Sequence, residues 1–101
     1  PVRTQLTLAA GLTNLYAYIE AHAGRAYLYL RFQAGASGVE KGVTVATIPA
    51  GARPAPYLLA PAVTHTGLGV AFFINGSDIV LDAPAIPANA YVTLAVASWA
   101  L

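Results

Sequence analysis

The sequence predicts an all-β domain, a single antiparallel β-sandwich or barrel of seven or eight strands with a jelly-roll-like arrangement. Apolar and polar residues alternate along most of the chain, as they do in half-buried strands. Glycine, proline and asparagine fall between the alternating runs, and helical periodicity is weak by comparison. The length of 101 residues is that of one domain, so residues 1–101 are expected to form one unit.

The first strand is expected in residues 2–8. Its apolar residues fall on one side, because every second residue of a strand points to the same face. That side carries Val2, Thr4, Leu6 and Leu8, and the other carries Arg3, Gln5 and Thr7.

The next two strands form a hairpin around Ala23-Gly24. A two-residue turn there gives a wholly apolar face, with Ala21 opposite Ala26, Ile19 opposite Leu28, Ala17 opposite Leu30 and Leu15 opposite Phe32. The other face carries Glu20 opposite Tyr27, Tyr18 opposite Tyr29 and Tyr16 opposite Arg31, with His22 and Arg25 at the turn. A slip of one residue would exchange the two faces, so their clean separation favours this register.

The middle of the chain carries two weaker strand signals. Residues 43–48 alternate, with Val43, Val45 and Thr47 on one side. Residues 57–65 are rich in β-forming residues, but they include Pro61. Because proline has no amide hydrogen to donate, Pro61 is expected at a sheet edge or in a loop.

A second hairpin is expected around residues 75–78. It pairs Ile74 with Ile79 and Phe72 with Leu81 on an apolar face, while Phe73, Val80 and Asp82 face outward. A tighter turn centred on Asn75-Gly76 shifts the register by two residues and leaves the faces unchanged.

The last strand is expected in residues 91–99. Val92, Leu94 and Val96 face one way, and Tyr91, Thr93, Ala95, Ala97 and Trp99 face the other. Trp99 is thus predicted on the polar side, as a stacking platform or an interface anchor. The alternative is a tryptophan that seals the end of the sandwich.

The small number of charged residues predicts that copies of the chain associate. Only nine of 101 residues are charged, and 57% are hydrophobic. A compact monomer of this size exposes on the order of 5,400 Å², so each charged group keeps roughly 600 Å² in contact with water. Because monomers rarely expose apolar patches beyond a few hundred Å², we expect a homo-oligomer.

Composition also excludes several classes of partner. The net charge of +1 offers no basic surface for nucleic acid. No apolar run reaches the ~18 residues of a membrane-spanning helix, so no membrane insertion is expected.

There is no cysteine for a disulfide framework. Because the chain opens on Pro1 rather than methionine, it is expected to be a processed chain or part of a longer protein.

Four tyrosines on the polar face of the first hairpin are the most suggestive cluster. A tyrosine can pack against a second subunit or stack under a sugar ring, and both alternatives remain open here. Glu20 and Arg31 add groups that can orient a polar ligand by charge-assisted hydrogen bonds. The candidate saccharide contacts are Tyr27, Tyr29, Arg31, Glu20, His65 and Trp99, and the candidate interface residues are Tyr16, Tyr18, Phe73 and Tyr91.

Catalytic and metal chemistry have little support. Glu20 and His22 lie two residues apart on one strand face, but a closed zinc site needs four ligands, so no metal or other cofactor is predicted unless a threefold axis completes the set. The chain holds four carboxylates and no Gly-x-Ser-x-Gly motif, which makes a glycan-cleaving enzyme the weakest hypothesis. We therefore predict a protein that is not an enzyme.

Three segments resemble the C-terminal head domains of bacteriophage tail-fibre and baseplate receptor-binding proteins. They are the strand and turn of residues 43–54, which end in Arg53-Pro54, the hairpin of residues 70–81, and the closing strand of residues 91–99. The chain departs from that family at Ala52, where an aromatic residue often precedes the Arg-Pro pair. The resemblance covers roughly the second half of the chain.

This resemblance implies a single β head domain at the tail tip or baseplate of a virion. Such heads are small jelly-roll or barrel domains that form trimers and bind saccharides on the host cell surface, often near subunit seams. The expected function is host-receptor binding without catalysis. The alternative is a purely structural virion module, such as a decoration or fibre-assembly domain without a glycan site.

Overall fold

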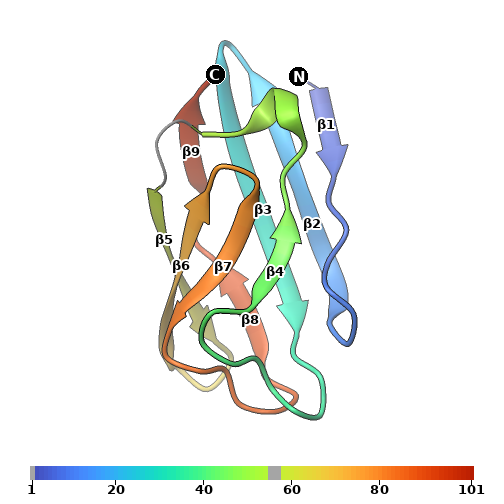
Figure 1. Ribbon diagram of the computed structural model, residues 1–101, viewed down its shortest axis with the longest axis vertical. Helices are drawn as coiled ribbons and strands as arrows, with labels where there is room; N and C mark the ends of the chain where they lie inside the picture. Colours follow the sequence, from blue (N-terminus) through green and yellow to red (C-terminus); the bar gives the residue numbers. More distant parts are fainter. Residues whose placement is uncertain (1, 55–57) are drawn as a thin grey trace.

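The computed structural model describes residues 2–54 and 58–101, and these residues form an all-β fold (Figure 1). The prediction of an all-β antiparallel domain is confirmed. The described strands are β1 (Val2–Gln5), β2 (Thr13–His22), β3 (Arg25–Gln33), β4 (Thr44–Thr47), β5 (Leu58–Thr64), β6 (Gly69–Asn75), β7 (Asp78–Ala83), β8 (Tyr91–Leu94) and β9 (Ala97–Ala100). One short 3₁₀ helix, η1 (Ala50–Ala52), follows β4.

The strands belong to one antiparallel sheet that curls on itself. Its order is β1-β2-β3-β8-β5-β6-β7-β4, and β9 pairs with the first half of β3. The two ends of this order meet at a bridge between Leu8 and Ala46, where the amide of Ala9 donates to the carbonyl of Val45 at 2.9 Å. The result is an elongated half-barrel of 37 × 22 × 22 Å whose concave side holds the core.

The core is built from inward-facing residues of nearly every strand. Phe32 of β3 and Phe72 of β6 meet edge to face, with ring centroids 6.2 Å apart, and both are fully buried. They are surrounded by fully buried aliphatic side chains that include Ile19, Leu28, Leu30, Ile48, Ile74, Ile79 and Leu81. Alternation in the sequence therefore marks the two faces of the curled sheet.

Both hairpins form in a predicted register. In the β2–β3 hairpin Ala21 pairs with Ala26 and Ala17 with Leu30, and the turn residue Ala23 has φ 52°. In the β6–β7 hairpin Ile74 pairs with Ile79 and Phe72 with Leu81, with Asn75 opposite Asp78 rather than inside the turn. Phe73 and Asp82 are half-buried on the outer face, whereas Val80 is buried.

The predicted pairing of Leu15 with Phe32 is wrong. The ladder shifts between Asn14 and Tyr16, so that Asn14 pairs with Phe32 and Leu15 has no place in the apolar row. A bulge adds one residue to a strand and reverses the direction of the side chains beyond it. Leu15 is accordingly exposed.

The predicted last strand is broken into β8 and β9, which is why the described sheet has one strand more than expected. Arg31 pairs with Thr93 and Leu28 with Ala97, so the three residues 94–96 stand opposite only two, Leu30 and Tyr29. This bulge turns the following residues over. The prediction that Trp99 faces solvent is wrong: its side chain is 5% exposed, and it seals one end of the barrel as the alternative proposed.

Strand β5 confirms most of the predicted run 57–65, although Tyr57 lies outside the described residues. Pro61 lies within β5 rather than in a loop, and it pairs with Ala71 of β6. The β5–β8 ladder ends next to it, at Ala62 and Leu94, so Pro61 has a ladder partner on one side only, as expected of an edge position. Its carbonyl still accepts a hydrogen bond from the amide of Ala95 at 3.0 Å.

Candidate functional site

Strands β1, β2 and β3 carry a row of aromatic and charged side chains on the outside of the sheet. We call this the tyrosine surface, made of Arg3, Tyr16, Tyr18, Glu20, Tyr27, Tyr29 and Arg31. The hairpin register places Glu20 beside Tyr27, Tyr18 beside Tyr29 and Tyr16 beside Arg31, as predicted. All seven side chains are exposed or half-buried.

The centre of the tyrosine surface is a stack of three flat groups. The guanidinium of Arg3 lies 4.0 Å from the centre of the Tyr18 ring, in cation–π contact. Tyr18 in turn stacks on Tyr29, with ring centroids 4.9 Å apart and planes 22° from parallel. Arg3 also donates from Nη2 to Glu20 Oε2 at 3.0 Å. This hydrogen bond raises the pKa of Arg3 above its ordinary value, so the stack stays charged at any physiological pH.

This stack determines which tyrosine can receive a ligand. Both faces of Tyr18 are covered, one by Arg3 and the other by Tyr29. On the side of Tyr29 away from β2, strand pairing is interrupted between β8 and β9, where Ala95 and Val96 are both exposed. Among the described residues no other ring or cation contacts Tyr29. We call this side the open face of Tyr29.

The other predicted saccharide contacts are divided between two places and the core. Tyr27 and Arg31 lie on either side of Tyr29 along β3. His65 instead lies beside Tyr91, with ring centroids 5.5 Å apart, and its Nδ1 accepts the Tyr91 amide at 3.1 Å. Trp99 is excluded from ligand stacking by its burial.

The predicted interface residues are not brought together. Tyr16 and Tyr18 belong to the tyrosine surface, whereas Phe73 lies on the outside of β6 and Tyr91 at the start of β8. Tyr16 contacts Tyr18 at a tilt of 52° with centroids 6.3 Å apart. A single contact surface between copies cannot use all four at its centre.

A continuous apolar area on the outside of the sheet was not predicted from the sequence. We call it the apolar outer face, and it is made of Pro61, Val63, Ala71, Thr93, Ala95 and Val96. It includes a shallow hollow of about 300 Å³ between β5 and β8. It adjoins the open face of Tyr29 through the Ala95–Val96 bulge. The apolar outer face could not be predicted from the sequence, because it forms only when β5 lies between β6 and β8.

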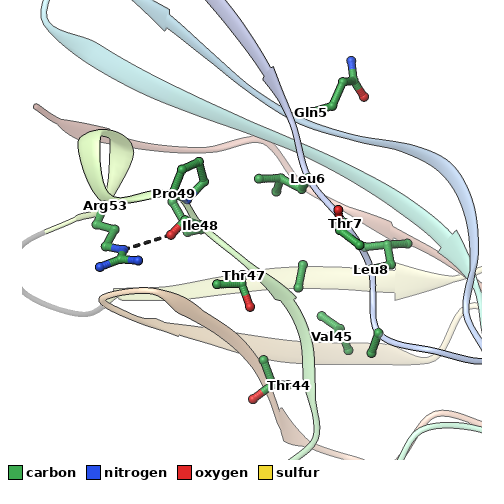
Figure 2. A pocket seen from close by; sticks show the side chains of 12 residues that line it. Gln5, Leu6, Thr7, Leu8, Thr44, Val45, Thr47, Ile48, Pro49 and Arg53 are labelled. Carbon is green, nitrogen blue, oxygen red and sulfur yellow. Dashed lines mark hydrogen bonds between the residues drawn. The ribbon is translucent and has the colours of Figure 1, made fainter.

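A groove of about 490 Å³ follows the line where the two ends of the sheet approach each other (Figure 2). Apolar side chains of Leu6, Val45 and Ile48 line it, and threonines line much of the rest. Arg53 is its one charged lining residue among those described, and Arg53 Nε donates to the carbonyl of Ile48 at 2.9 Å. Figure 2 shows this bond joining Arg53, which follows η1, to Ile48, the residue directly after β4.

Carboxylates are dispersed across the described residues. Glu20 is paired with Arg3, and Asp78 accepts a hydrogen bond from Ser77 at 3.2 Å. No group of three or more His, Cys, Asp or Glu side chains comes together within residues 2–54 and 58–101. No helix in the same ranges is long and apolar enough to cross a membrane.

No protein-family model and no curated protein matches this chain. Its function is therefore inferred from its own side chains, chiefly the Arg3–Tyr18–Tyr29 stack and the apolar outer face. These two features differ in chemistry, because one is aromatic and charged and the other is wholly uncharged.

Proposed function

We propose that this chain is a non-enzymatic receptor-binding head of a phage tail device that holds a host saccharide on the open face of Tyr29. The observation that carries the proposal is the Arg3–Tyr18–Tyr29 stack, which holds one aromatic face ready for a flat ligand. The virion location and the role in host attachment rest on the resemblance to tail-fibre and baseplate heads. A curled antiparallel sheet is a scaffold compatible with the jelly-roll or barrel form of such heads.

The residues around Tyr29 suit a sugar ring. One face of a pyranose ring presents C–H groups that can stack on an aromatic ring. The hydroxyls of the sugar project from the edge of the pyranose ring. The guanidinium of Arg31 and the hydroxyl of Tyr27 lie one strand repeat away on either side and can bond such hydroxyls. Because Tyr18 and Arg3 already restrict the Tyr29 ring, little conformational entropy is lost when it binds.

Self-association is part of the proposal. The folded chain exposes 5219 Å², close to the value expected for a monomer, and Val63 and Val96 of the apolar outer face are 47% and 54% exposed. A standard interface buries about 800 Å² per partner. We propose that copies join through the apolar outer face as a trimer, which places the open face of Tyr29 near a seam and raises avidity for a repeated glycan.

The apolar outer face also favours the second candidate function, a purely structural virion module. In that case copies would assemble through the same face, and the tyrosine surface would serve only as contact area. Binding of host glycan by the assembled protein separates the two candidates.

The saccharide site is tested by removing the Tyr29 ring. We expect Tyr29→Ala to weaken binding to host cell-wall glycan by about tenfold or more, because the stacking face is lost. Tyr91→Ala is the matched control, since it removes another exposed tyrosine on the same side of the sheet, beside His65. Isothermal titration against glycan fragments measures both. Unchanged affinity for Tyr29→Ala, or an equal loss for Tyr91→Ala, contradicts the site.

Association is tested by placing a charge on the apolar outer face. Light scattering should give the unmodified chain a mass near three times its 10.4 kDa, and Val63→Lys should reduce it to a monomer because a buried lysine lacks a partner. Val2→Lys makes the same change at a side chain that is 69% exposed on β1, and it should keep the oligomer. A monomeric unmodified protein at micromolar concentration rules out this part of the proposal.

A further inference from the structure

We infer that a second, separate binding site for a neutral pyranose unit lies on the outside of β6, in a hollow lined by Leu59, Phe73, Asn75 and Asp82. The hollow has a volume of about 500 Å³. None of these residues belongs to the tyrosine surface, and no saccharide contact was predicted among them. The choice of a saccharide as ligand rests on the proposed function, whereas the hollow itself does not involve the Tyr29 site.

The hairpin register builds the hollow. Leu59 and Phe73 are paired across β5 and β6, so their side chains lie next to each other on the outer face. Asn75 follows Phe73 by two residues and shares that face. Asp82 comes from the neighbouring strand β7, where Ala71 pairs with Ala83 but Phe72 pairs with Leu81. The ladder shift leaves Asp82 without a residue opposite it, and its carboxylate lines the hollow.

The two polar side chains of the hollow are uncommitted. Within residues 2–54 and 58–101, neither the Asn75 amide nor the Asp82 carboxylate makes a side-chain hydrogen bond or ion pair. Glu20 and Asp78, by contrast, are held by Arg3 and Ser77. Asp82 is nevertheless half-buried, so part of its hydration is already lost. A half-buried carboxylate beside an apolar wall gains from a ligand that supplies hydroxyl donors.

The combination of side chains indicates the ligand. Phe73 and Leu59 provide an apolar wall for the C–H face of a sugar ring. Asp82 accepts hydrogen bonds from hydroxyls, and Asn75 both donates and accepts. Asp82 would repel an acidic ligand. A purely apolar ligand would bury the Asp82 carboxylate without giving it a hydrogen-bond partner. A ligand with an apolar face and a rim of hydroxyls matches the apolar wall and supplies partners to the Asn75 amide and the Asp82 carboxylate.

The two sites share one continuous outer surface. From β3 to β6 the sheet order runs β3, β8, β5, β6, which is three strand spacings or about 14 Å. The apolar outer face on β8 and β5 lies between the two sites and is buried where copies join, so a polysaccharide does not pass directly from Tyr29 to Phe73. The two sites of one protomer therefore bind separate sugar units, and avidity comes from the repeated copies of each site.

The test is an ¹⁵N NMR titration of the full chain with glucose, galactose, mannose and N-acetylglucosamine, each as the free sugar at millimolar concentration. At least one sugar should shift the Asn75 side-chain amide together with the backbone amides of Phe73 and Asp82. Asp82→Ala should raise the dissociation constant obtained from those shifts about tenfold, because a charge-assisted hydrogen bond is lost. Glu40→Ala is the control, since this exposed carboxylate lies outside the hollow, and it should leave the dissociation constant within twofold.

Shifts near Tyr29 and shifts near Phe73 report the two sites separately. If sugars shift only residues 27–31, the proposed function stands and the second site is wrong. If they shift only the residues around Phe73, the second site stands and the Tyr29 site fails. Tetramethylammonium chloride tests the competing ligand class: shifts by this cation that Asp82→Ala abolishes, without shifts by any sugar, assign the hollow to a cation and overturn the inference.

Discussion

Replacing Trp99 with alanine is expected to lower the free energy of unfolding by about 3–5 kcal/mol, the largest single-residue loss expected in this chain. The indole is almost fully buried at the end of the barrel, and Nε1 donates to the carbonyl of Ala52 at 2.8 Å. Alanine leaves a cavity and an unpaired carbonyl in η1. Urea unfolding followed by circular dichroism measures the loss.

Trp99→Phe is the matched control for this prediction. It keeps most of the buried ring and removes the indole N–H, so it should cost about 1–2 kcal/mol. Because Trp99 is the one tryptophan of the chain, its fluorescence gives a second readout. Emission of the folded protein should be blue-shifted and should move to the red on unfolding. Emission of the folded protein near that of free tryptophan contradicts the sealed position.

The second large effect is expected at Gly38. Alanine there should destabilise the fold by about 3 kcal/mol, for two reasons that add. The residue has φ +70°, which disfavours any side chain, and a Cβ would collide with the carbonyl oxygen of Ile86. That carbonyl already accepts the amide of Val39 at 2.9 Å in the bridge that ties the loop after β3 to the segment before β8.

Gly67→Ala separates the two reasons. Gly67 has φ +90°, and no atom lies within 4 Å of the place that a Cβ would take, so only the backbone cost of about 1 kcal/mol applies. Thermal unfolding of both variants gives the difference between them. Equal losses at Gly38 and Gly67 would show that the loop carrying Gly38 moves away freely and that the contact with Ile86 is unimportant.

The sequence predicted the local pairings well and the long-range ones poorly. The β2–β3 and β6–β7 hairpins were predictable because a short turn fixes the register and an apolar face confirms it. The order β3-β8-β5 was not predictable, since it depends on packing between segments some 30 to 60 residues apart. The apolar outer face and the hollow beside Phe73 both depend on such pairings.

Two errors at single residues have one physical cause. Leu15 and Trp99 were assigned to the wrong face because each lies at or beyond a bulge, and strict alternation holds only while a ladder is uninterrupted. Tyr18, Tyr27 and Tyr29 lie in the uninterrupted part of the β2–β3 ladder, between the turn and the bulge, and were assigned correctly. Arg3 was missed as part of the site for another reason, since no short turn links β1 to β2 and its pairing with Glu20 could not be counted from the sequence.

The edge strands of the sheet affect how copies of this chain can associate. β1 and β4 end the strand order, and β9 has β3 as its partner in the described part of the chain; each of the three is only four residues long. Short edge strands are poor templates for pairing with a strand of another chain, which protects a very apolar protein from fibrous aggregation. Growth by strand extension is thereby discouraged, and contact through side chains is left as the route to a closed, finite particle.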